Sequence, residues 1–299
     1  MVSLKQLKYF DAVARSGHFG KAAAHCAISQ PALSMQVQEL ERSLGVQLLE
    51  RGRNGVILTE GGREIAQRAA RVLADVRDIV DAARRQGDVL SGPLALGVIP
   101  SLAPYILPRL LPKIRDGFPD LDLHIRETQT QSLVGELVDG ELDLLLLALP
   151  VEHPDVETVR LFDDRFLLAM ATAHRMSDDV RATPDLLEGD KLLLLEEGHC
   201  MRDQALAFCN LQRVENINTF GASSLSTLVQ MVANGLGMTL LPEIAVPLET
   251  RHGDIHLMRF ADPEPQRVIG LAWRKSSPRK RHFVELGQMI TDAASTAAR

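Results

Sequence analysis

The chain contains few cysteines and no long apolar run. Its 299 residues include three cysteines, Cys26, Cys200 and Cys209. An odd and small number of cysteines does not suit the disulfide framework of a small secreted domain. The longest apolar stretch, Leu142–Pro150, is interrupted by Asp143 and falls short of the roughly 18–20 residues of a membrane-spanning helix. The first residues lack the basic and apolar segments of a secretory leader, so we expect a cytoplasmic protein without a membrane partner.

Internal repeats and low-complexity segments are also missing. The chain is 45% hydrophobic and 24% charged, which excludes a disordered or fibrous protein and allows sizeable cores. Its net charge is −6, yet residues 1–90 carry 13 Lys and Arg against 10 Asp and Glu, while the remainder carries 20 against 29. The positive part is therefore the N-terminal part, although this asymmetry alone does not establish DNA binding.

The first 58 residues have the pattern of three short helices and a β wing. Apolar residues recur every third position from Leu4 to Val13, and an Ala-rich second helix follows over Phe19–Cys26. Ser29 is placed to cap a third helix, which Gly45 ends. Val46–Leu58, with the turn pair Asn54-Gly55, suits a small hairpin.

The third helix presents polar side chains once its apolar face is turned inward. Its N-terminal half leaves Gln30, Ser34 and Gln38 outward, with Pro31 in the first turn, and such amides and hydroxyls suit base edges and phosphates. A generic three-helix bundle explains the apolar spacing equally well. The small-residue second helix and the short turn favour a helix-turn-helix. On the wing, Arg51 and Arg53 are expected to contact the flanking DNA backbone.

Residues 59–88 predict a long linker helix capped by Thr59. Its apolar residues, from Ile65 to Ala83, alternate spacings of four and three over nearly three heptads. We expect this stripe to pair with the same helix of a second subunit. The alternative is an amphipathic helix that packs on its own domain.

Residues 89–299 predict an α/β effector domain. Near-continuous apolar strands alternate with helical patterns, which indicates a parallel sheet with both faces covered. The length favours two subdomains, one of approximately 89–162 and 267–299 and the other of approximately 163–266, joined where the chain crosses at Phe162–Phe166. In such folds ligands bind in the cleft, at the carboxyl ends of strands.

The segment Gly198–Cys209 follows an apolar strand, so Cys200 should lie at a strand end or helix start. A helix N-terminus with His199, Arg202 and Arg267 nearby favours a thiolate, the form that attacks peroxide. If residues 200–209 form one helix, the two cysteine Cα atoms are roughly 13–14 Å apart, whereas a disulfide needs about 7 Å or less. A disulfide would then require this segment to unwind. On chemistry alone, small buried cysteines remain an alternative, and a metal site is disfavoured because a fourth ligand is missing.

Residues 1–65 closely resemble the winged helix-turn-helix of LysR-type transcriptional regulators. That family joins this domain through a linker helix to a two-subdomain, periplasmic-binding-protein-like effector domain, an architecture that would cover all 299 residues. The resemblance implies a regulator of double-stranded promoter DNA that works with RNA polymerase as a homodimer or homotetramer. It is carried by the segments Leu4–Phe10, Gly17–Phe19, Ala22–Ala24, Ser29–Ser34, Leu40–Glu41, Leu44–Val46, Leu49–Arg51 and Leu58–Gly62.

The cysteine segment resembles the redox loop of the peroxide-sensing activators within that family, as do Ala222–Leu228, Gly235–Pro242 and Pro263–Arg267. The resemblance implies that Cys200 reacts with hydrogen peroxide, that Cys209 resolves it as a disulfide, and that no cofactor or metal takes part. Cys26 is expected in the core. A peroxide pocket is implied around Cys200, made by Ser101, Thr130, His199, Asp203 and Arg267, and Ser101 stands where the resemblance leads us to expect threonine.

Two other functions compete with peroxide sensing. A LysR-type regulator that binds a small organic effector in the cleft would not need Cys209. A thiol peroxidase or cysteine hydrolase would use Cys200 with His199, but chain neighbours rarely pair as nucleophile and base, and no third orienting group is evident. We therefore expect a regulator and not an enzyme.

Overall fold

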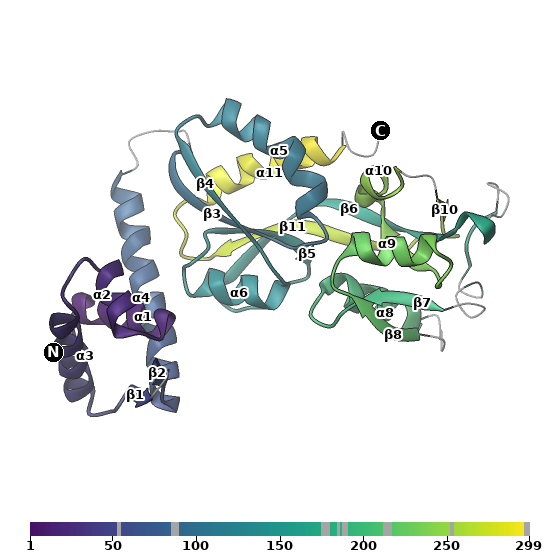
Figure 1. Cartoon of the computed structure of the whole chain (residues 1–299). Coiled ribbons are helices and arrows are strands. Elements are labelled where there is room, and N and C mark those ends of the chain that lie inside the picture. The colour runs from purple at the N-terminus through teal and green to yellow at the C-terminus, as the bar shows by residue number, and fades with distance from the viewer. Residues whose placement is uncertain are drawn as a thin grey trace. The chain divides into compact units, whose positions relative to one another are not determined.

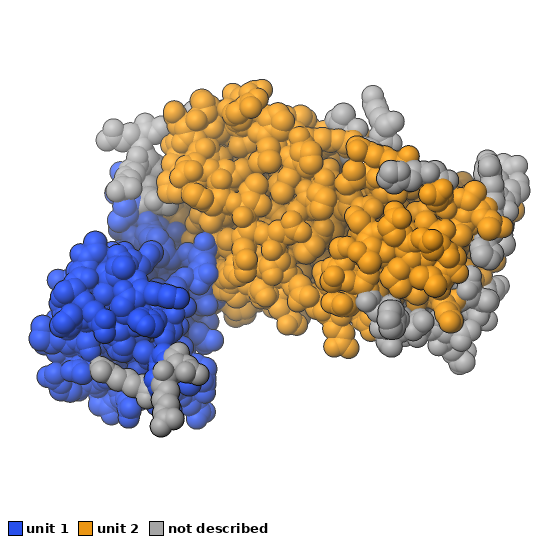
Figure 2. All heavy atoms as spheres, in the orientation of Figure 1, with its two compact units in different colours: residues 1–86, 138–141 blue, residues 87–137, 142–299 orange. Residues whose placement is uncertain are grey.

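The computed structural model describes residues 1–52, 55–84, 90–174, 180–183, 186, 191–211, 217–251 and 254–295. The chain forms two compact units, which Figure 2 distinguishes by colour. One comprises residues 1–86 with 138–141, and the other residues 87–137 with 142–299. No helix in the described ranges is both long and apolar enough to cross a membrane.

The N-terminal unit contains three short helices, a two-stranded wing and a long helix, as the sequence predicted (Figure 1). The strands of the wing pair antiparallel, with Leu49 opposite Leu58. The elements are α1 (Leu4–Ser16), α2 (Phe19–His25), α3 (Gln30–Leu44), β1 (Leu49–Gly52), β2 (Gly55–Leu58) and α4 (Glu60–Arg84).

Capping residues fix where these helices begin and end. Ser3 and Gln6 form a reciprocal capping box at the start of α1, which satisfies two otherwise unpaired groups. The hydroxyl of Ser29 accepts the Ala32 N–H at 3.4 Å at the start of α3. Gly45 ends α3 at φ +68°, a left-handed conformation that glycine adopts without steric cost.

The core of this unit joins all of its helices. Phe10, Leu33 and Leu40 are fully buried in one cluster with Leu48 from the loop before the wing. Gly62 lies so close to that loop that a Cβ atom would come 2.0 Å from the Leu48 carbonyl oxygen. The start of α4 is thereby fixed against the wing.

The long helix α4 buries part of its apolar residues and exposes the rest. Ala69 is buried in the core cluster, whereas Val72 is 41% exposed and Ile79 is 66% exposed. The exposed residues belong to the predicted heptad stripe. Pairing of this stripe with a second subunit stays a prediction.

The effector unit is built on a mixed sheet of seven strands among the described residues. Strand β3 (Gly92–Val98) lies parallel to β4 (Leu121–Glu127) and to β5 (Leu144–Leu149). Strand β11 (Gln266–Arg274), however, is antiparallel to β5. The prediction of a parallel sheet is therefore right for β3–β5 and wrong for the other strands of this sheet, because apolar runs reveal burial on both faces but not strand direction.

The 16-residue strand β6 (Val156–Ala171) links the two parts of this sheet. Up to Arg165 it pairs antiparallel with β11, and from Phe166 it pairs with β9 (Thr239–Pro242) and then β10 (Ile255–Met258). The exchange of partners falls at the end of the segment where the sequence predicted the chain to cross.

A second, two-stranded sheet carries the cysteine segment. Strand β7 (Leu192–Leu195) is parallel to β8 (Ile217–Ala222), and α8 (Cys200–Leu211) connects them.

Helices α5 and α11 contact each other over the larger sheet (Figure 1). The remaining helices are α5 (Ala103–Gly117), α6 (Thr130–Val138), α9 (Leu225–Ala233), α10 (Val246–Glu249) and α11 (Lys280–Ser295), with short 3-10 turns η1 (Thr172–His174) and η2 (Glu243–Ala245).

The sequence missed β8, β10 and the first half of β6. In that half, exposed and half-buried positions alternate, so it lacks the continuous apolar run that marked the other strands. β10 is only four residues long, and β8 contains Asn218 and Gly221, which have low strand propensity.

Candidate functional site

The predicted DNA-contacting residues lie on α3 and the wing. Gln30, Pro31 and Gln38 are exposed, and Ser34 is half-buried on the same helix. Arg51 belongs to β1, although its side chain is not among those described, and Arg53 lies outside the described residues. The described members thus share the outer face of α3, opposite the buried Leu33 and Leu40.

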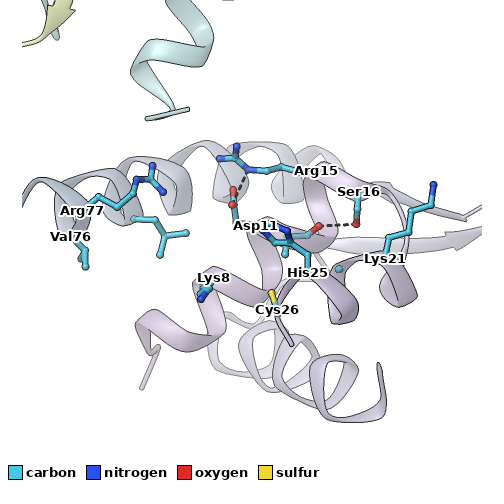
Figure 3. Close-up of a pocket in the computed structure, with 12 residues that line it drawn as sticks. Lys8, Asp11, Arg15, Ser16, Lys21, His25, Cys26, Val76 and Arg77 are labelled. Atoms are coloured by element: carbon cyan, nitrogen blue, oxygen red, sulfur yellow. Dashed lines mark hydrogen bonds and ion pairs between the residues drawn. The ribbon is translucent and has the colours of Figure 1, made fainter. Parts of the chain in front are cut away.

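A cavity of about 720 Å³ opens between α1, α2 and α4 of this unit (Figure 3). Cys26 lies at its wall and also packs against the core cluster, so the prediction that Cys26 is a core residue holds in part. Lys8, Lys21 and Arg15 contribute basic groups to the lining, and Arg15 is paired with Asp11 at 2.8 Å.

Ser101 and Thr130 follow neighbouring parallel strands of the effector unit. Val98, near the end of β3, lies opposite Glu127 at the end of β4. The chain then leads to Ser101, which is buried, and to Thr130, which begins α6. The Thr130 Oγ1 atom is buried and has no hydrogen-bond partner among the described residues. A buried hydroxyl without a partner is uncommon and suggests a place for a ligand or water.

The loop before Cys200 contacts the residue next to Thr130. The Gln129 side-chain amide donates to the Glu197 carbonyl at 3.3 Å. Gly198 has φ +90°, a conformation that glycine adopts without strain, and a Cβ atom there would lie 2.4 Å from Gln129 Oε1. The residue before Thr130 therefore contacts the loop that leads to Cys200.

Cys200 is the first residue of α8, as predicted, and is a half-buried free thiol. The backbone of Cys209 lies in the same helix, while its side chain is not among those described. Residues 200–209 thus form one helix, which is the condition under which a disulfide between the two cysteines requires this segment to unwind. Nine residues at 1.5 Å per residue separate their Cα atoms by roughly 13–14 Å.

The neighbours of Cys200 differ in their surroundings. His199 is buried, and this burial lowers its pKa, an effect that the nearby Glu196 partly opposes. A neutral imidazole is therefore favoured, so His199 can exchange hydrogen bonds but does not supply the cation that we expected. Arg202 is also buried, and its Nη1 donates to the Leu195 carbonyl at 3.0 Å. Asp203 is exposed in the first turn of α8.

Arg267 is fully buried and holds Ser101. Its Nη1 donates to Ser101 Oγ at 2.7 Å, and its Nη2 donates to the Ser101 carbonyl at 3.1 Å. Its Nε donates to Asp164 Oδ2 at 2.9 Å, and its Nη2 lies 2.8 Å from the same oxygen. Arg267 and Asp164 are cross-strand partners on β11 and β6. Two of the predicted pocket residues are thus joined directly.

Asp164 was not predicted from the sequence. It stands beside Asp163 and Arg165 in the predicted crossing Phe162–Phe166, and only the register of β6 against β11 reveals its partner. The one signal in the sequence that could have indicated this residue is an acidic side chain within the predicted crossing, since a buried Arg267 needs an acidic partner.

A second buried polar cluster was also missed. The Tyr105 hydroxyl donates to Glu249 Oε1 at 2.7 Å, and the Ser226 hydroxyl donates to the same oxygen at 2.8 Å. Burial and the Glu249 carboxylate raise the pKa of Tyr105, while the charge of Arg267 lowers it. This cluster connects α5 to α9 and α10 near the Arg267 site.

The described residues include no group of three or more His, Cys, Asp and Glu that could hold a metal ion.

The family model for the LysR substrate binding domain matches residues 87–295. The model for the bacterial regulatory helix-turn-helix proteins of the lysR family matches residues 4–63. The chain belongs to the LysR family. Its two matched segments correspond to the N-terminal helices and wing and to the effector domain.

Curated LysR-family relatives resemble the chain over nearly its whole length. The Escherichia coli K12 protein named DNA-binding transcriptional dual regulator OxyR is 40% identical over 97% of this chain and 95% of its own. A probable hydrogen peroxide-inducible genes activator of Streptomyces viridosporus is 46% identical over 97% of this chain and 94% of its own.

Solved structures agree with these relatives. A full-length OxyR cysteine variant from Pseudomonas aeruginosa has a TM-score of 0.83 at 38% identity, covering 97% of this chain and 95% of that one. A Corynebacterium glutamicum OxyR cysteine mutant bound to hydrogen peroxide has a TM-score of 0.70 at 36% identity, covering 99% and 94%.

Proposed function

We propose that this LysR-family protein is a DNA-binding transcription regulator that senses hydrogen peroxide through Cys200. The observation that carries the proposal is the buried Thr130 Oγ1, which lacks a partner among the described residues and whose chain neighbour Gln129 contacts the segment that leads to Cys200. A small ligand with hydrogen-bond donors and acceptors at both ends fits such a site. The names of the relatives and the peroxide-bound neighbour support the same ligand.

The reaction consumes one peroxide per chain. The Cys200 thiolate attacks one peroxide oxygen, forming an S–O bond as the O–O bond breaks, and hydroxide leaves and takes up a proton to become water. Cys209 then attacks the sulfenic sulfur, which forms the disulfide and releases a second water. Two thiols and one peroxide thus give one disulfide and two waters. Because this oxidation occurs once per chain, we propose a regulator and not an enzyme.

Each pocket residue has a role in this proposal. The hydroxyls of Ser101 and Thr130 bind and orient the peroxide, and the buried guanidinium of Arg267 supplies positive charge where hydroxide develops. Neutral His199 contributes hydrogen bonds. Asp203 assists proton transfer from the exposed side of α8.

Disulfide formation then changes the fold. Helix α8 holds the two cysteines too far apart, so the bond requires α8 to unwind. Met201 and Ala205 of α8 are buried, so unwinding disturbs the packing beneath it. We propose that this repacking shifts the contacts between the subdomains, approximately 89–162 with 267–299 and approximately 163–266, and those between subunits.

We propose that this change alters how the protein binds DNA in the cytoplasm. We propose that α4 forms a homodimer, that two dimers form a homotetramer, and that the regulator acts on RNA polymerase at the promoter. Residues Gln30, Pro31, Ser34 and Gln38 would contact bases and phosphates in the major groove, and Arg51 and Arg53 the flanking backbone.

The proposal is tested by footprinting on a target promoter before and after stoichiometric peroxide. The wild-type footprint should change in length or half-site spacing, and the Cys200→Ser footprint should stay in its reduced form. Cys26→Ser is the matched control, because it removes a half-buried thiol from the other unit, and it should respond like wild type. A Cys200→Ser protein with a normal response would overturn the proposal.

A further inference from the structure

Asp164 is a buried charge with no part in the reaction as described above. Its side chain is 2% exposed and that of Arg267 is 0% exposed. Its Oδ2 accepts the Arg267 Nε at 2.9 Å, and its Oδ1 accepts the Ile244 N–H at 3.1 Å. Both carboxylate oxygens are therefore held by buried donors. Such a carboxylate is fixed in position, and so is the guanidinium that it binds.

A fixed Arg267 determines what the Ser101 hydroxyl does. Arg267 Nη1 donates to Ser101 Oγ at 2.7 Å, and a guanidinium has donors only. The Ser101 hydrogen cannot be directed at Arg267 and has to point to another acceptor. Ser101 is thereby set as a hydrogen-bond donor, which is the role that a leaving hydroxide oxygen requires.

We propose that Asp164 is a positioning residue for the peroxide reaction, which it serves by holding Arg267 so that Ser101 donates to the departing oxygen. This inference rests on the proposed function of Cys200. Removing the carboxylate charge frees the guanidinium to turn away from Ser101, which then loses its fixed orientation. The rate of the reaction with peroxide should then fall, because cleavage of the O–O bond needs a donor at the leaving oxygen. Alkylation is not affected, because the Cys200 thiolate attacks the carbon of iodoacetamide and displaces iodide without that donor.

The experiment compares two reactions of Cys200 in the full-length reduced protein, with hydrogen peroxide and with iodoacetamide. Asp164→Asn should lower the peroxide rate constant by roughly 10- to 100-fold, as misplaced catalytic groups do, and leave alkylation within about twofold. Asp164→Glu keeps the charge but moves it by one methylene, so the peroxide rate should fall less, by roughly three- to tenfold. The double variant Asp164→Asn with Ser101→Ala should react no more slowly than Ser101→Ala alone.

Asp143→Asn is the matched control. Asp143 also contacts an arginine of β11, Arg274, at 3.5 Å, and accepts a backbone N–H, that of Ala95, at 2.9 Å. Its loss disturbs a similar pair in the same sheet and should change neither rate.

The outcomes separate the inference from the proposed function. Equal losses in both rates for Asp164→Asn would show a merely structural role and overturn the inference, as would unchanged rates. If Asp164→Asn does not fold, Asp164→Glu decides, because an unchanged peroxide rate in that variant also overturns it. A wild-type Cys200 no faster with peroxide than a free cysteine would instead overturn the proposed function.

Discussion

The DNA-binding unit and the proposed peroxide site are assembled over very different distances along the chain. The caps of α3 and α4 join residues three positions apart, such as Ser29 with Ala32 and Thr59 with Gly62. The hydrogen bond from Arg267 to Ser101 spans 166 positions, and that from Arg267 to Asp164 spans 103. Local signals therefore specify the first region. The residues of the second region depend on strand register and come into contact only in the folded domain.

The two described cysteines differ in the same way. Cys26 ends α2 in a small-residue helix and lines a cavity within its own unit (Figure 3). Cys200 begins α8, directly after a loop that the Gln129 side chain, from a distant part of the chain, contacts at Glu197. The difference teaches that the reactivity of a thiol follows the groups that the fold brings to it.

The largest effect is expected from Arg267→Leu. It leaves Asp164 buried without its cation, which should destabilise the effector unit by about 3–5 kcal/mol. Denaturant unfolding of the full chain, followed by tryptophan fluorescence, measures this because Trp273 lies on β11. The double variant Arg267→Leu with Asp164→Leu should recover much of the loss. A double variant no more stable than the single one would contradict an uncompensated charge as the cause.

A loss of similar or smaller size is expected from Leu33→Ala in the other region. Leu33 is fully buried in the N-terminal core, so the cavity should cost about 2–5 kcal/mol and weaken DNA binding. The rate of Cys200 with peroxide should stay at the wild-type value, because that site lies in the effector unit. Gel-shift titration and peroxide kinetics on one preparation check both statements, and a slowed Cys200 would show that the regions are not independent.

A cap substitution should have a more modest effect. The Thr59 hydroxyl accepts the Gly62 N–H at 2.8 Å and donates to the Gln47 carbonyl at 2.8 Å. Thr59→Ala should therefore destabilise the start of α4 by about 1 kcal/mol, and Thr59→Ser should restore most of it. Thermal unfolding of the three proteins distinguishes these outcomes. An alanine variant as stable as wild type would argue against the cap.

The smallest effect concerns His199 and pH. Burial lowers the pKa of His199, so the unfolded chain binds a proton more readily than the folded one. Its contribution to stability is complete above the ordinary histidine pKa of about 6.5 and is lost as the pH falls below that value. His199→Gln should show a shallower loss of stability between neutral and acidic pH. Identical slopes for the two proteins would contradict a buried neutral imidazole.

Much of the fold was predictable, for physical reasons that particular residues show. Helix α1 was located from apolar residues that recur every third position, and α3 and α4 were located from Ser29, Gly45 and Thr59, which act within one turn of the chain. The strands that lack polar residues, such as β7, were located from their buried leucines. Strand direction was not, because β11 carries the same apolar signal whether it runs parallel or antiparallel to β5.

The site was predictable in its members but not in its connections. Ser101, Thr130 and Arg267 were identified by resemblance, and no local pattern of the sequence would have joined them. Asp164 was missed because its partner Arg267 lies 103 positions away and is brought to it only by the register of β6 against β11. The lowered pKa of His199 likewise depends on burial, which its sequence neighbours do not reveal.

The central claim, a switch from two thiols to one disulfide, is tested most directly by peptide mapping under non-reducing conditions. Trypsin cleaves after Arg202 and so separates Cys200 from Cys209 onto two peptides. After near-stoichiometric peroxide, these two peptides should be recovered joined to each other, with the Cys26 peptide unmodified. Recovery of Cys200 and Cys209 only as free thiols would contradict the account.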